Sequence, residues 1–398
     1  MRTRTTVIAA VTFIAAAAAF AACSDSVTPP APDSLSPMFA KGGPPPKTVK
    51  SVSVAPSSST IAAGGTVQLA ATANPSGSAT SFTWASSNTA VATVSTSGLV
   101  TGVAAGSASV TATAGSKTGT STIIVQSAPP PGAQVLVGAG DIADCSRSGD
   151  EATAKLLDGI SGTVFTLGDD AYPNGSASDF ANCYAPTWGR HKARTMPAPG
   201  NHEYQTAGAA GYFGYFGSAA GDTTKGYYSY NLGDWHIVVL NSNSNCTTIS
   251  CSASSAQVQW LVADLAANPK TCTLAYWHHP RFNSGAAHGN DLKVGPFWNA
   301  LYDFNADVVL NGHEHVYERF APQTPSAVAS ANGIRQFTVG TGGASEYAFN
   351  PTPEPNSEAR NDNTQGVLKL TLRATSYDWQ FIPVAGATFT DSGSTSCH

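Results

Sequence analysis

The chain has 398 residues, which is enough for two or three domains and at least one large hydrophobic core. Only 11% of the residues are charged, whereas Gly (38) and Pro (25) are plentiful, so strands and loops are favoured over long surface helices. The net charge of -5 and the lack of a basic stripe in the sequence argue against nucleic-acid binding.

The first 22 residues have the pattern of an export signal: Arg2 and Arg4 precede an apolar run that ends just before Cys23. Residues 19–23 resemble the cleavage site of a bacterial lipoprotein, although Phe20 stands where Leu is commoner. We therefore expect a lipid anchor on Cys23, with plain secretion as the alternative. Residues 23–47 are rich in Pro, Ser and Gly, which predicts a disordered tether. The expected location is the cell envelope, or the periplasmic or extracellular space.

The cysteine count is consistent with export. Of the seven cysteines, six remain once Cys23 is set aside, and six can pair fully in an oxidising compartment. Sequence alone allows 15 connectivities for six cysteines. Proximity in the sequence most strongly favours the pair Cys246 with Cys251. We also expect Cys145 to pair with Cys183, and Cys272 with Cys397.

Residues 48–126 contain short alternating apolar segments, separated by turn residues at intervals of about ten. This pattern predicts an all-β sandwich. Its segments 69–72, 84–88, 91–94 and 98–102 closely resemble the bacterial Ig-like domain of group 2. The resemblance implies a spacer or adhesive module that contacts the cell envelope or a polysaccharide. Residues 127–133, with three consecutive prolines, are expected to form a stiff linker.

A second domain, of α/β type, is expected over residues 134–398. Its early apolar strands alternate with helical patterns, whereas the apolar segments 336–339, 367–372 and 379–384 follow one another without helices. The combination predicts two stacked mixed β-sheets flanked by helices. Two sets of residues are expected to share one helical face each: Val258, Leu261, Val262 and Leu265, after a cap at Ser254 or Ser255, and Val294, Phe297, Leu301 and Phe304.

Five apolar strands of this domain end in Asp, Asn or His. A single Gly-Asp pair after a strand is a common turn, but five such endings are hard to explain as turns. Parallel strands bring their carboxyl ends to one rim of a sheet, so the polar residues are expected to converge there. They are Asp141, Asp169 with Tyr172, Asn201 with His202, His278, and His313 with His315.

In order and spacing, these blocks resemble the purple acid phosphatases of the metallophosphoesterase superfamily, from about residue 135 to residue 319. The resemblance implies two metal ions bridged by Asp169, and it assigns the ligands of each. Asp141, Tyr172 and His315 would hold the first metal, and Asn201, His278 and His313 the second.

The donor types agree with such a centre. Two cations about 3.5–4 Å apart can clamp an in-line displacement and generate hydroxide near neutral pH. Phenolate and carboxylate suit a hard trivalent ion, whereas imidazole and amide suit a divalent one. The expected cofactors are therefore two metal ions, Fe(III) with Zn, Mn or Fe(II), and in the resembling enzymes the counterpart of Tyr172 gives the iron its purple colour.

Two further histidines are candidates for catalysis beside Asp169. His202 directly follows a candidate ligand and is expected to act as general acid toward the leaving oxygen, or to hydrogen-bond the phosphate. His288 lies in a Gly-rich loop where the family places a substrate-contacting His, with an ordinary surface histidine as the alternative.

Other polar residues receive simpler interpretations. His279 is expected to orient His278, His236 to be packed or at a sheet edge, and His191 to be solvated. Asp170 and Glu203 are interpreted as turn residues or as partners of the ligands. Ala143 departs from the Gly that is usual two residues after Asp141, which would strain the loop if its φ were positive.

The leading hypothesis is an exported binuclear acid phosphatase that hydrolyses small phosphate monoesters by attack of metal-bound hydroxide. A phosphodiesterase or nucleotidase that uses the same site is the nearest alternative. An alternative of another class is a surface adhesive protein with a vestigial phosphatase domain, which a missing ligand would have favoured; all seven ligand positions are intact.

Overall fold

The computed structural model describes residues 48–79, 81–126, 132–243 and 245–398. The predicted export signal, the anchor residue Cys23, the tether and most of the predicted linker lie outside these residues. Within the described residues, no helix is both long enough and apolar enough to cross a membrane.

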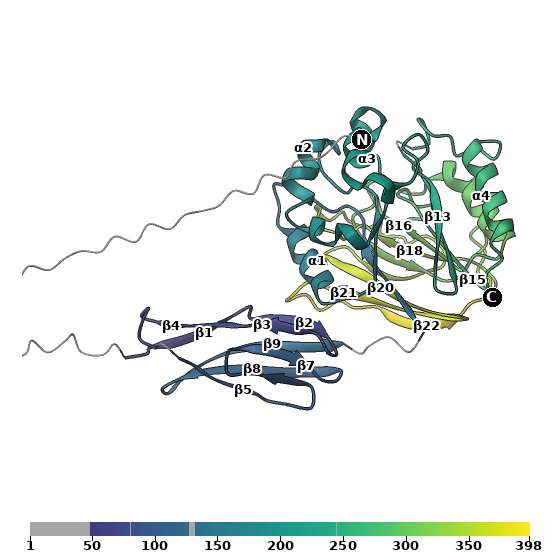
Figure 1. Cartoon of the computed structure of the whole chain (residues 1–398). Coiled ribbons are helices and arrows are strands. Elements are labelled where there is room, and N and C mark those ends of the chain that lie inside the picture. Colours follow the sequence, from purple (N-terminus) through teal and green to yellow (C-terminus); the bar gives the residue numbers. More distant parts are fainter. Residues whose placement is uncertain (1–47, 80, 127–131, 244) are drawn as a thin grey trace, which may run out of the picture. The chain divides into compact units, whose positions relative to one another are not determined.

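The N-terminal part is all-β, as predicted (Figure 1). Along β8 and β9, buried residues such as Val110 and Ile123 alternate with exposed ones, so each strand turns one face to the core. The strand orders are β2-β9-β8-β5, β3-β7-β6 and β1-β4. The strands are β1 (Ser51–Ala55), β2 (Ser58–Ala62), β3 (Thr66–Gln68), β4 (Ala70–Asn74), β5 (Thr83–Ser86), β6 (Ala92–Val94), β7 (Leu99–Gly102), β8 (Gly106–Ala114) and β9 (Lys117–Gln126).

The C-terminal part contains two mixed sheets. The first has the order β12-β11-β10-β20-β21-β22, in which β10, β11 and β12 are parallel. The second has the order β13-β14-β15-β16-β18-β17-β19, with β14, β15, β16 and β18 parallel. Their bounds are β10 (Gln134–Ala139), β11 (Thr163–Leu167), β12 (Thr195–Ala198), β13 (Tyr228–Leu232), β14 (Trp235–Val239), β15 (Cys272–Tyr276), β16 (Val308–Asn311), β17 (Tyr317–Phe320), β18 (Arg335–Val339), β19 (Ser357–Asn361), β20 (Gly366–Arg373), β21 (Ser376–Pro383) and β22 (Ser392–Ser396).

Helices flank these sheets, and Figure 1 shows α4 on the outer side of β13 and β15. The α-helices are α1 (Gly149–Asp158), α2 (Ala177–Asp179), α3 (Ala210–Phe216), α4 (Ala256–Ala267) and α5 (Gly295–Asp303). The shorter helical turns are η1 (Phe180–Tyr184), η2 (Trp188–Arg194), η3 (Glu203–Gln205), η4 (Ala207–Ala209), η5 (Gly217–Ala220) and η6 (Leu292–Val294). The architecture is the predicted pair of stacked sheets with helices outside.

Strand β15 separates two hydrophobic cores because its side chains alternate between the faces of the sheet. Leu274 and Tyr276 pack between the two sheets, together with Val137 and Phe165 of the first sheet. Ala275 packs on the opposite face, in the core that the seven-stranded sheet forms with α4 and α5. Both faces of the central parallel strands are thus covered, which holds their carboxyl ends in fixed positions.

The predicted helices form, with two corrections. Ser255 caps α4 by accepting a hydrogen bond from the backbone N–H of Val258. Val262 does not share the buried face, because it lies on its flank and is 41% exposed. Phe304 is also exposed, because it is the C-cap of α5, where the chain leaves the helix.

All three predicted disulfides form. Cys272 begins β15 in the seven-stranded sheet, and Cys397 directly follows β22 in the six-stranded sheet. This bridge therefore joins the two sheets.

Replacing both Cys272 and Cys397 with Ser is expected to lower the free energy of unfolding by about 5 kcal/mol, because this bridge spans 125 residues of the chain. The same replacement at Cys246 and Cys251, which are 5 residues apart, is expected to cost about 2 kcal/mol. Urea unfolding of both variants measures the two losses in free energy of unfolding and shows which is larger. A larger loss for the short loop would contradict the loop-entropy explanation.

Candidate metal centre

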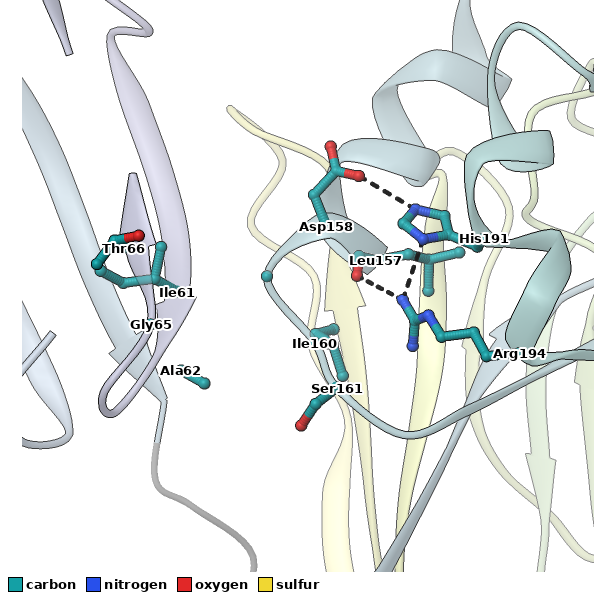
Figure 2. A pocket seen from close by; sticks show the side chains of 11 residues that line it. Ile61, Ala62, Gly65, Thr66, Leu157, Asp158, Ile160, Ser161, His191 and Arg194 are labelled. Carbon is teal, nitrogen blue, oxygen red and sulfur yellow. Dashed lines mark hydrogen bonds and ion pairs between the residues drawn. The ribbon is translucent and has the colours of Figure 1, made fainter. Parts of the chain in front are cut away.

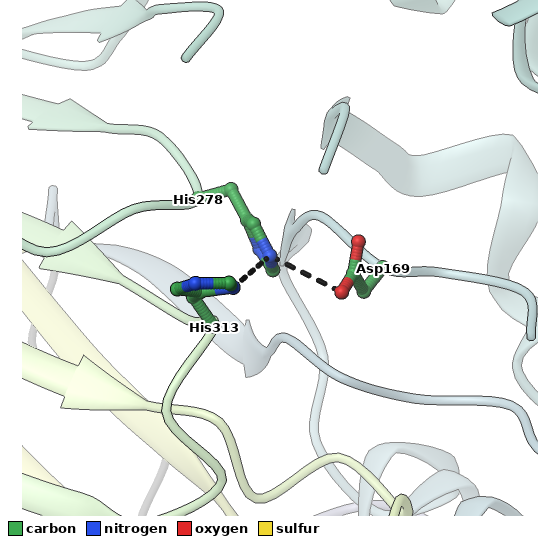
Figure 3. A group of neighbouring side chains, drawn as sticks. All are labelled: Asp169, His278 and His313. Atoms are coloured by element: carbon green, nitrogen blue, oxygen red, sulfur yellow. Dashed lines mark hydrogen bonds and ion pairs between the residues drawn. The ribbon is translucent and has the colours of Figure 1, made fainter. Parts of the chain in front are cut away.

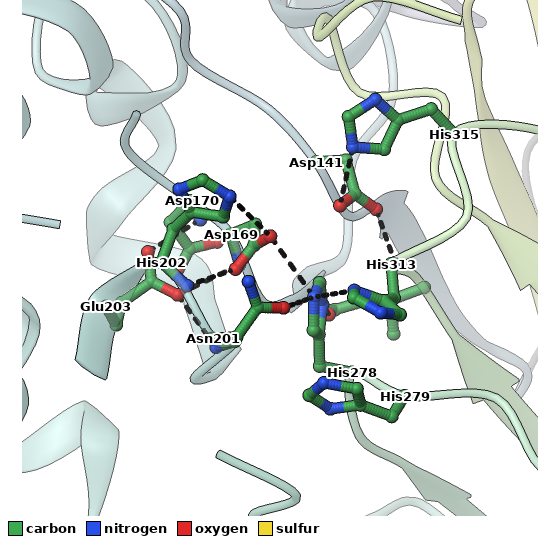
Figure 4. Close-up of polar contacts among 12 residues, drawn as sticks. Asp141, Asp169, Asp170, Asn201, His202, Glu203, His278, His279, His313 and His315 are labelled. Carbon is green, nitrogen blue, oxygen red and sulfur yellow. Dashed lines mark hydrogen bonds and ion pairs between the residues drawn. The ribbon is translucent and has the colours of Figure 1, made fainter. Parts of the chain in front are cut away.

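The predicted strand ends converge at one rim of the two sheets (Figure 4). Asp141 follows β10, and Asp169 follows β11. Asn201 follows β12, His278 follows β15, and His313 follows β16. Tyr172 and His315 come from the same loops as Asp169 and His313. The structure thus brings together all seven side chains that the sequence predicts as ligands.

Three of these residues have a strained backbone. Asp141, Asp169 and His313 have φ values of 60°, 52° and 70°, in the left-handed region that is uncommon for residues other than Gly. Such conformations persist only where the surrounding structure imposes them, and they cluster at functional sites. Gly168 precedes Asp169 and has a φ of 83°, and an added Cβ there would lie 2.6 Å from the backbone N of Gly200.

Asp141, Tyr172 and His315 form one half of the site. The hydroxyl of Tyr172 lies 3.1 Å from Asp141 Oδ1, 3.4 Å from Asp169 Oδ2 and 3.1 Å from His315 Nε2. His315 Nε2 is itself 3.3 Å from Asp141 Oδ1. The phenol has one proton to donate but faces three acceptor atoms, an arrangement that a cation would satisfy better than hydrogen bonds can.

His278, Asn201 and His313 form the other half, and Asp169 lies beside both halves. His278 Nε2 lies 3.2 Å from Asp169 Oδ2, 3.0 Å from Asn201 Oδ1 and 3.1 Å from His313 Nδ1. One ligand atom each of Asp169, His278 and His313 lies within 4.8 Å of the others (Figure 3). Asp169 therefore has the position that a bridging carboxylate requires.

Backbone carbonyls orient two of these imidazoles. His278 Nδ1 donates to Leu167 O at 2.7 Å, and His315 Nδ1 donates to Ser345 O at 2.5 Å. In the neutral imidazole the other nitrogen then carries a lone pair. Both Nε2 lone pairs face carboxylate oxygens, which is unfavourable unless a cation or a proton lies between them. This orientation by a carbonyl is the usual setting of a metal-binding histidine.

The pKa shifts agree with a site built for cations. Burial alone would lower the pKa of His278, but the Asp169 carboxylate raises it to about 9. Burial and the charges of Asp141 and Asp169 raise the pKa of the Tyr172 phenol well above its usual value. Burial and the neighbouring imidazoles lower the pKa of His313 well below its usual value. His313 is thus neutral, as a ligand must be, whereas His278 would release a proton when a cation binds its Nε2.

His202 and His288 both line the site. His202 Nδ1 donates to Pro173 O at 2.5 Å, and its Nε2 lies 3.9 Å from Asp169 Oδ2. The ring of His288 lies against that of His313, with centroids 3.9 Å apart and the planes 31° apart. His288 is an exposed loop residue beside a candidate ligand, and its contact with substrate stays a prediction.

Glu203 and Asp170 lie directly behind the site. The buried carboxylate of Glu203 accepts hydrogen bonds from the backbone N–H groups of Gly200, Asp169, Asp170 and Ala171, over 2.7–3.3 Å. It thereby joins the loops after β11 and β12. Asp170 is fully buried, and neither of its carboxylate oxygens makes a hydrogen bond of good geometry within the described residues. Neither residue is a simple turn residue.

We expect Asp170→Asn to stabilise the chelator-treated chain by about 1–3 kcal/mol near neutral pH. Burial and the charge of Glu203 raise the pKa of Asp170 well above 3.8, and the nearby Thr166 hydroxyl opposes this only in part. A carboxyl with a raised pKa in the folded state costs stability as the pH rises above its unfolded value. The gain should therefore grow from acidic to neutral pH in urea unfolding. A gain that does not depend on pH, or one shared by the exposed control Asp303→Asn, would contradict this explanation.

Several simpler predictions can be compared with the structure. His236 is packed, as one interpretation had it, and its Nε2 lies 2.7 Å from Asp264. The prediction that His191 is solvated is wrong: it is 9% exposed and contacts Asp158 and Arg194, because η2 packs it against α1 (Figure 2). Ala143 forms a short parallel bridge with Ala171 and has no positive φ. The loop after Asp141 therefore has no backbone strain from an Ala at this position.

His279 does not hydrogen-bond His278. Its Nδ1 lies 2.8 Å from the hydroxyl of Ser242, and its ring lies edge-on to that of His278, with centroids 4.9 Å apart. It can orient His278 only by packing.

Sequence reasoning gave no role to Glu314, which lies between the candidate ligands His313 and His315. Its side chain is fully buried. The chain bends here, with a φ of 70° at His313, and the carboxylate of Glu314 contacts residues 283–288 instead of the ligands. A buried carboxylate needs buried donors, but the sequence does not show which groups supply them.

Two family models match this chain. Residues 48–125 match the bacterial Ig-like domain (group 2), and residues 120–317 match the calcineurin-like phosphoesterase domain. The first residues of the second match, 120–126, belong to β9 of the Ig-like part. The chain thus combines an Ig-like domain with a metallophosphoesterase domain, as its sequence predicted.

Within that class, the chain is purple acid phosphatase-like. It is 27% identical to purple acid phosphatase 15 of Arabidopsis thaliana over 248 residues, which cover 52% of this chain and 46% of that protein. It is 33% identical to purple acid phosphatase 22 of the same plant over 158 residues, 37% and 35% of the two chains. The chain therefore matches less than half the length of these relatives.

A solved structure has the same fold. The purple acid phosphatase from yellow lupin seeds superposes with a TM-score of 0.54 and 18% identity, over 83% of this chain and 67% of that one.

Proposed function

We propose that this chain is an exported acid phosphatase that hydrolyses small phosphate monoesters at a centre of two metal ions. The observation that carries the proposal is the convergence of seven predicted ligands, with the Nε2 atoms of two histidines turned toward carboxylate oxygens. The similarity to purple acid phosphatases supports the same reaction class. The three disulfides support export.

The resemblance to purple acid phosphatases divides the ligands between the two ions. Asp141, Tyr172 and His315 would hold the first, Asn201, His278 and His313 the second, and Asp169 would bridge them. The half with the phenol and a carboxylate of its own suits Fe(III), and the half with two imidazoles and an amide oxygen suits Zn, Mn or Fe(II). When bound, such a pair supplies Lewis-acid stabilisation of the charge that develops on the phosphoryl group, and it acidifies water.

The protein side chains orient the ester and deliver a proton. His202 Nδ1–H is held at Pro173, so the proton for the leaving oxygen would come from Nε2 of the doubly protonated ring. His288 lies against His313, where it can hydrogen-bond a phosphoryl oxygen. The backbone N–H of His202 donates to Asp169 Oδ1 at 2.8 Å, which fixes the bridging carboxylate relative to the general acid.

Metal analysis and assays with two esters test the proposal. We expect two metal equivalents per chain, and a broad visible absorption band if ferric ion binds Tyr172. Turnover should be faster with p-nitrophenyl phosphate than with bis(p-nitrophenyl) phosphate. Preference for the diester or for nucleotides would instead establish the alternative, a phosphodiesterase or nucleotidase on the same site. A pure chain that binds no metal would refute the proposal.

The Ig-like domain has a proposed role of its own, as a contact to the cell envelope or to polysaccharide, with Cys23 as the lipid anchor. An adhesive protein with a vestigial catalytic domain is disfavoured because every candidate ligand is present. Binding of the full chain to cell-wall polysaccharide, together with ester hydrolysis, would support the joint role.

A further inference from the structure

The carboxylate of Glu314 is enclosed by a single loop. Its Oε1 accepts from Ala287 N at 3.0 Å. Its Oε2 accepts from Asn283 Nδ2 at 2.9 Å, from His288 N at 3.0 Å and from His288 Nδ1 at 3.2 Å. Gly285 makes the close approach possible, because a Cβ there would lie 2.1 Å from Glu314 Oε1. Residues 283–288 are thus wrapped around one buried carboxylate.

These contacts indicate which nitrogen of His288 donates. Two backbone N–H groups and the Asn283 amide donate to the two oxygens of Glu314, so this carboxylate acts as an acceptor. His288 Nδ1, 3.2 Å from Oε2, is then the donor of the remaining contact. Its Nε2 is the ring nitrogen left for another partner.

The ring of His288 lies beside the metal centre. It is tilted by 31° against the ring of His313, and its centroid lies 5.5 Å from that of Tyr347. The side chain is 36% exposed, so a substrate can reach it. Glu314 itself is fully buried and touches neither substrate nor solvent.

We propose that Glu314 is a positioning residue, which holds the loop 283–288 and keeps a proton on His288 Nδ1, so that Nε2 is the nitrogen left to meet the phosphate ester. The inference rests on the proposed function, since it takes the ester to be the group that His288 meets. It extends that function because Glu314, which lies between the candidate ligands His313 and His315, would position His288 instead of binding a metal.

The first test reads the tautomer of His288 directly, without turnover. In the zinc-loaded full chain, the side-chain nitrogen NMR signals of His288, identified by their loss in His288→Gln, are expected to show a protonated Nδ1. In Glu314→Gln one oxygen becomes an NH2 donor, so protonation of Nδ1 should fall. An unprotonated Nδ1 in the unaltered chain, or no change in the variant, would overturn the proposal.

The second test is a double-mutant cycle on ester turnover. We expect Glu314→Gln to lower kcat by about 10–100-fold, the usual effect of losing a partner of a site residue, while two zinc equivalents stay bound. In the His288→Gln background the same change should cost less than about 2-fold, because its effect passes through His288. A full effect without His288 would show that Glu314 acts on the fold alone.

Glu318→Gln is the matched control. Glu318 is equally buried and holds the same loop, through Ser284 N at 2.9 Å, but it does not contact His288. Its replacement should leave the His288 tautomer unchanged, and a tautomer shift as large as that in Glu314→Gln would refute the specific role. A chain that shows the predicted tautomer shift but hydrolyses no ester would refute the proposed function and leave the positioning of His288 established.

Discussion

Asp169→Asn is expected to lower kcat/KM for a phosphate monoester by about a thousandfold or more, and to reduce the bound metal below two equivalents. Asp169 is the candidate ligand that contacts both halves of the site, with Oδ2 3.4 Å from the Tyr172 hydroxyl and 3.2 Å from His278 Nε2. A neutral amide cannot bridge two cations as a carboxylate does. The loss removes several kcal/mol of transition-state stabilisation, and each 1.36 kcal/mol is a factor of about ten.

The measurement is steady-state kinetics together with metal analysis of the purified variant. Asp144→Asn serves as a control, because this carboxylate lies in the loop after Asp141 but bonds only Ser146 and Arg147. Asp144→Asn should keep both metals and most of the activity. Retention of two metal equivalents and normal turnover by Asp169→Asn would mean that the converging residues do not form the reactive centre.

Glu203→Ala is expected to lower the free energy of unfolding by about 3–5 kcal/mol, the largest loss we expect from a single substitution outside the ligands. In the Ala variant, four backbone N–H groups lose their acceptor; they belong to Gly200, Asp169, Asp170 and Ala171. Glu203→Gln keeps one accepting oxygen and should lose roughly half as much.

Urea unfolding of the metal-free chains measures both effects. Metal-free protein is the right sample because bound cations would add their own stabilisation to the folded state. If Glu203→Ala unfolds within about 1 kcal/mol of the unaltered chain, the four backbone groups have other acceptors, and the carboxylate does not hold the two loops together.

The site could be predicted from sequence because each ligand directly follows an apolar strand. Parallel pairing of β10, β11 and β12, and of β14, β15 and β16, then places Asp141, Asp169 and His313 at one rim. The contacts behind this rim could not be predicted in the same way. Glu203 and Glu314 act through backbone N–H groups of distant loops, and no pattern of residue types marks a backbone donor.

Helix α1 shows a different limit. Its buried face consists of Asp150, Thr153, Ala154 and Leu157, so only two apolar residues mark this face in the sequence. The orientation of His191 follows from the packing of η2 beside this unpredicted helix, through contacts with Ala154 O and Asp158. The burial of His191 therefore depends on an element that the sequence pattern did not reveal.

The carbonyls of Leu167 and Ser345 accept hydrogen bonds from His278 and His315. The orientation of these two imidazole rings is therefore fixed by the protein and does not depend on a bound cation. The stripped protein should then retain its shape after chelation, and ion exchange should require no refolding of the polypeptide. The same scaffold would accept different divalent ions, so the identity of the ion in the half with Asn201, His278 and His313 would follow which ion is available.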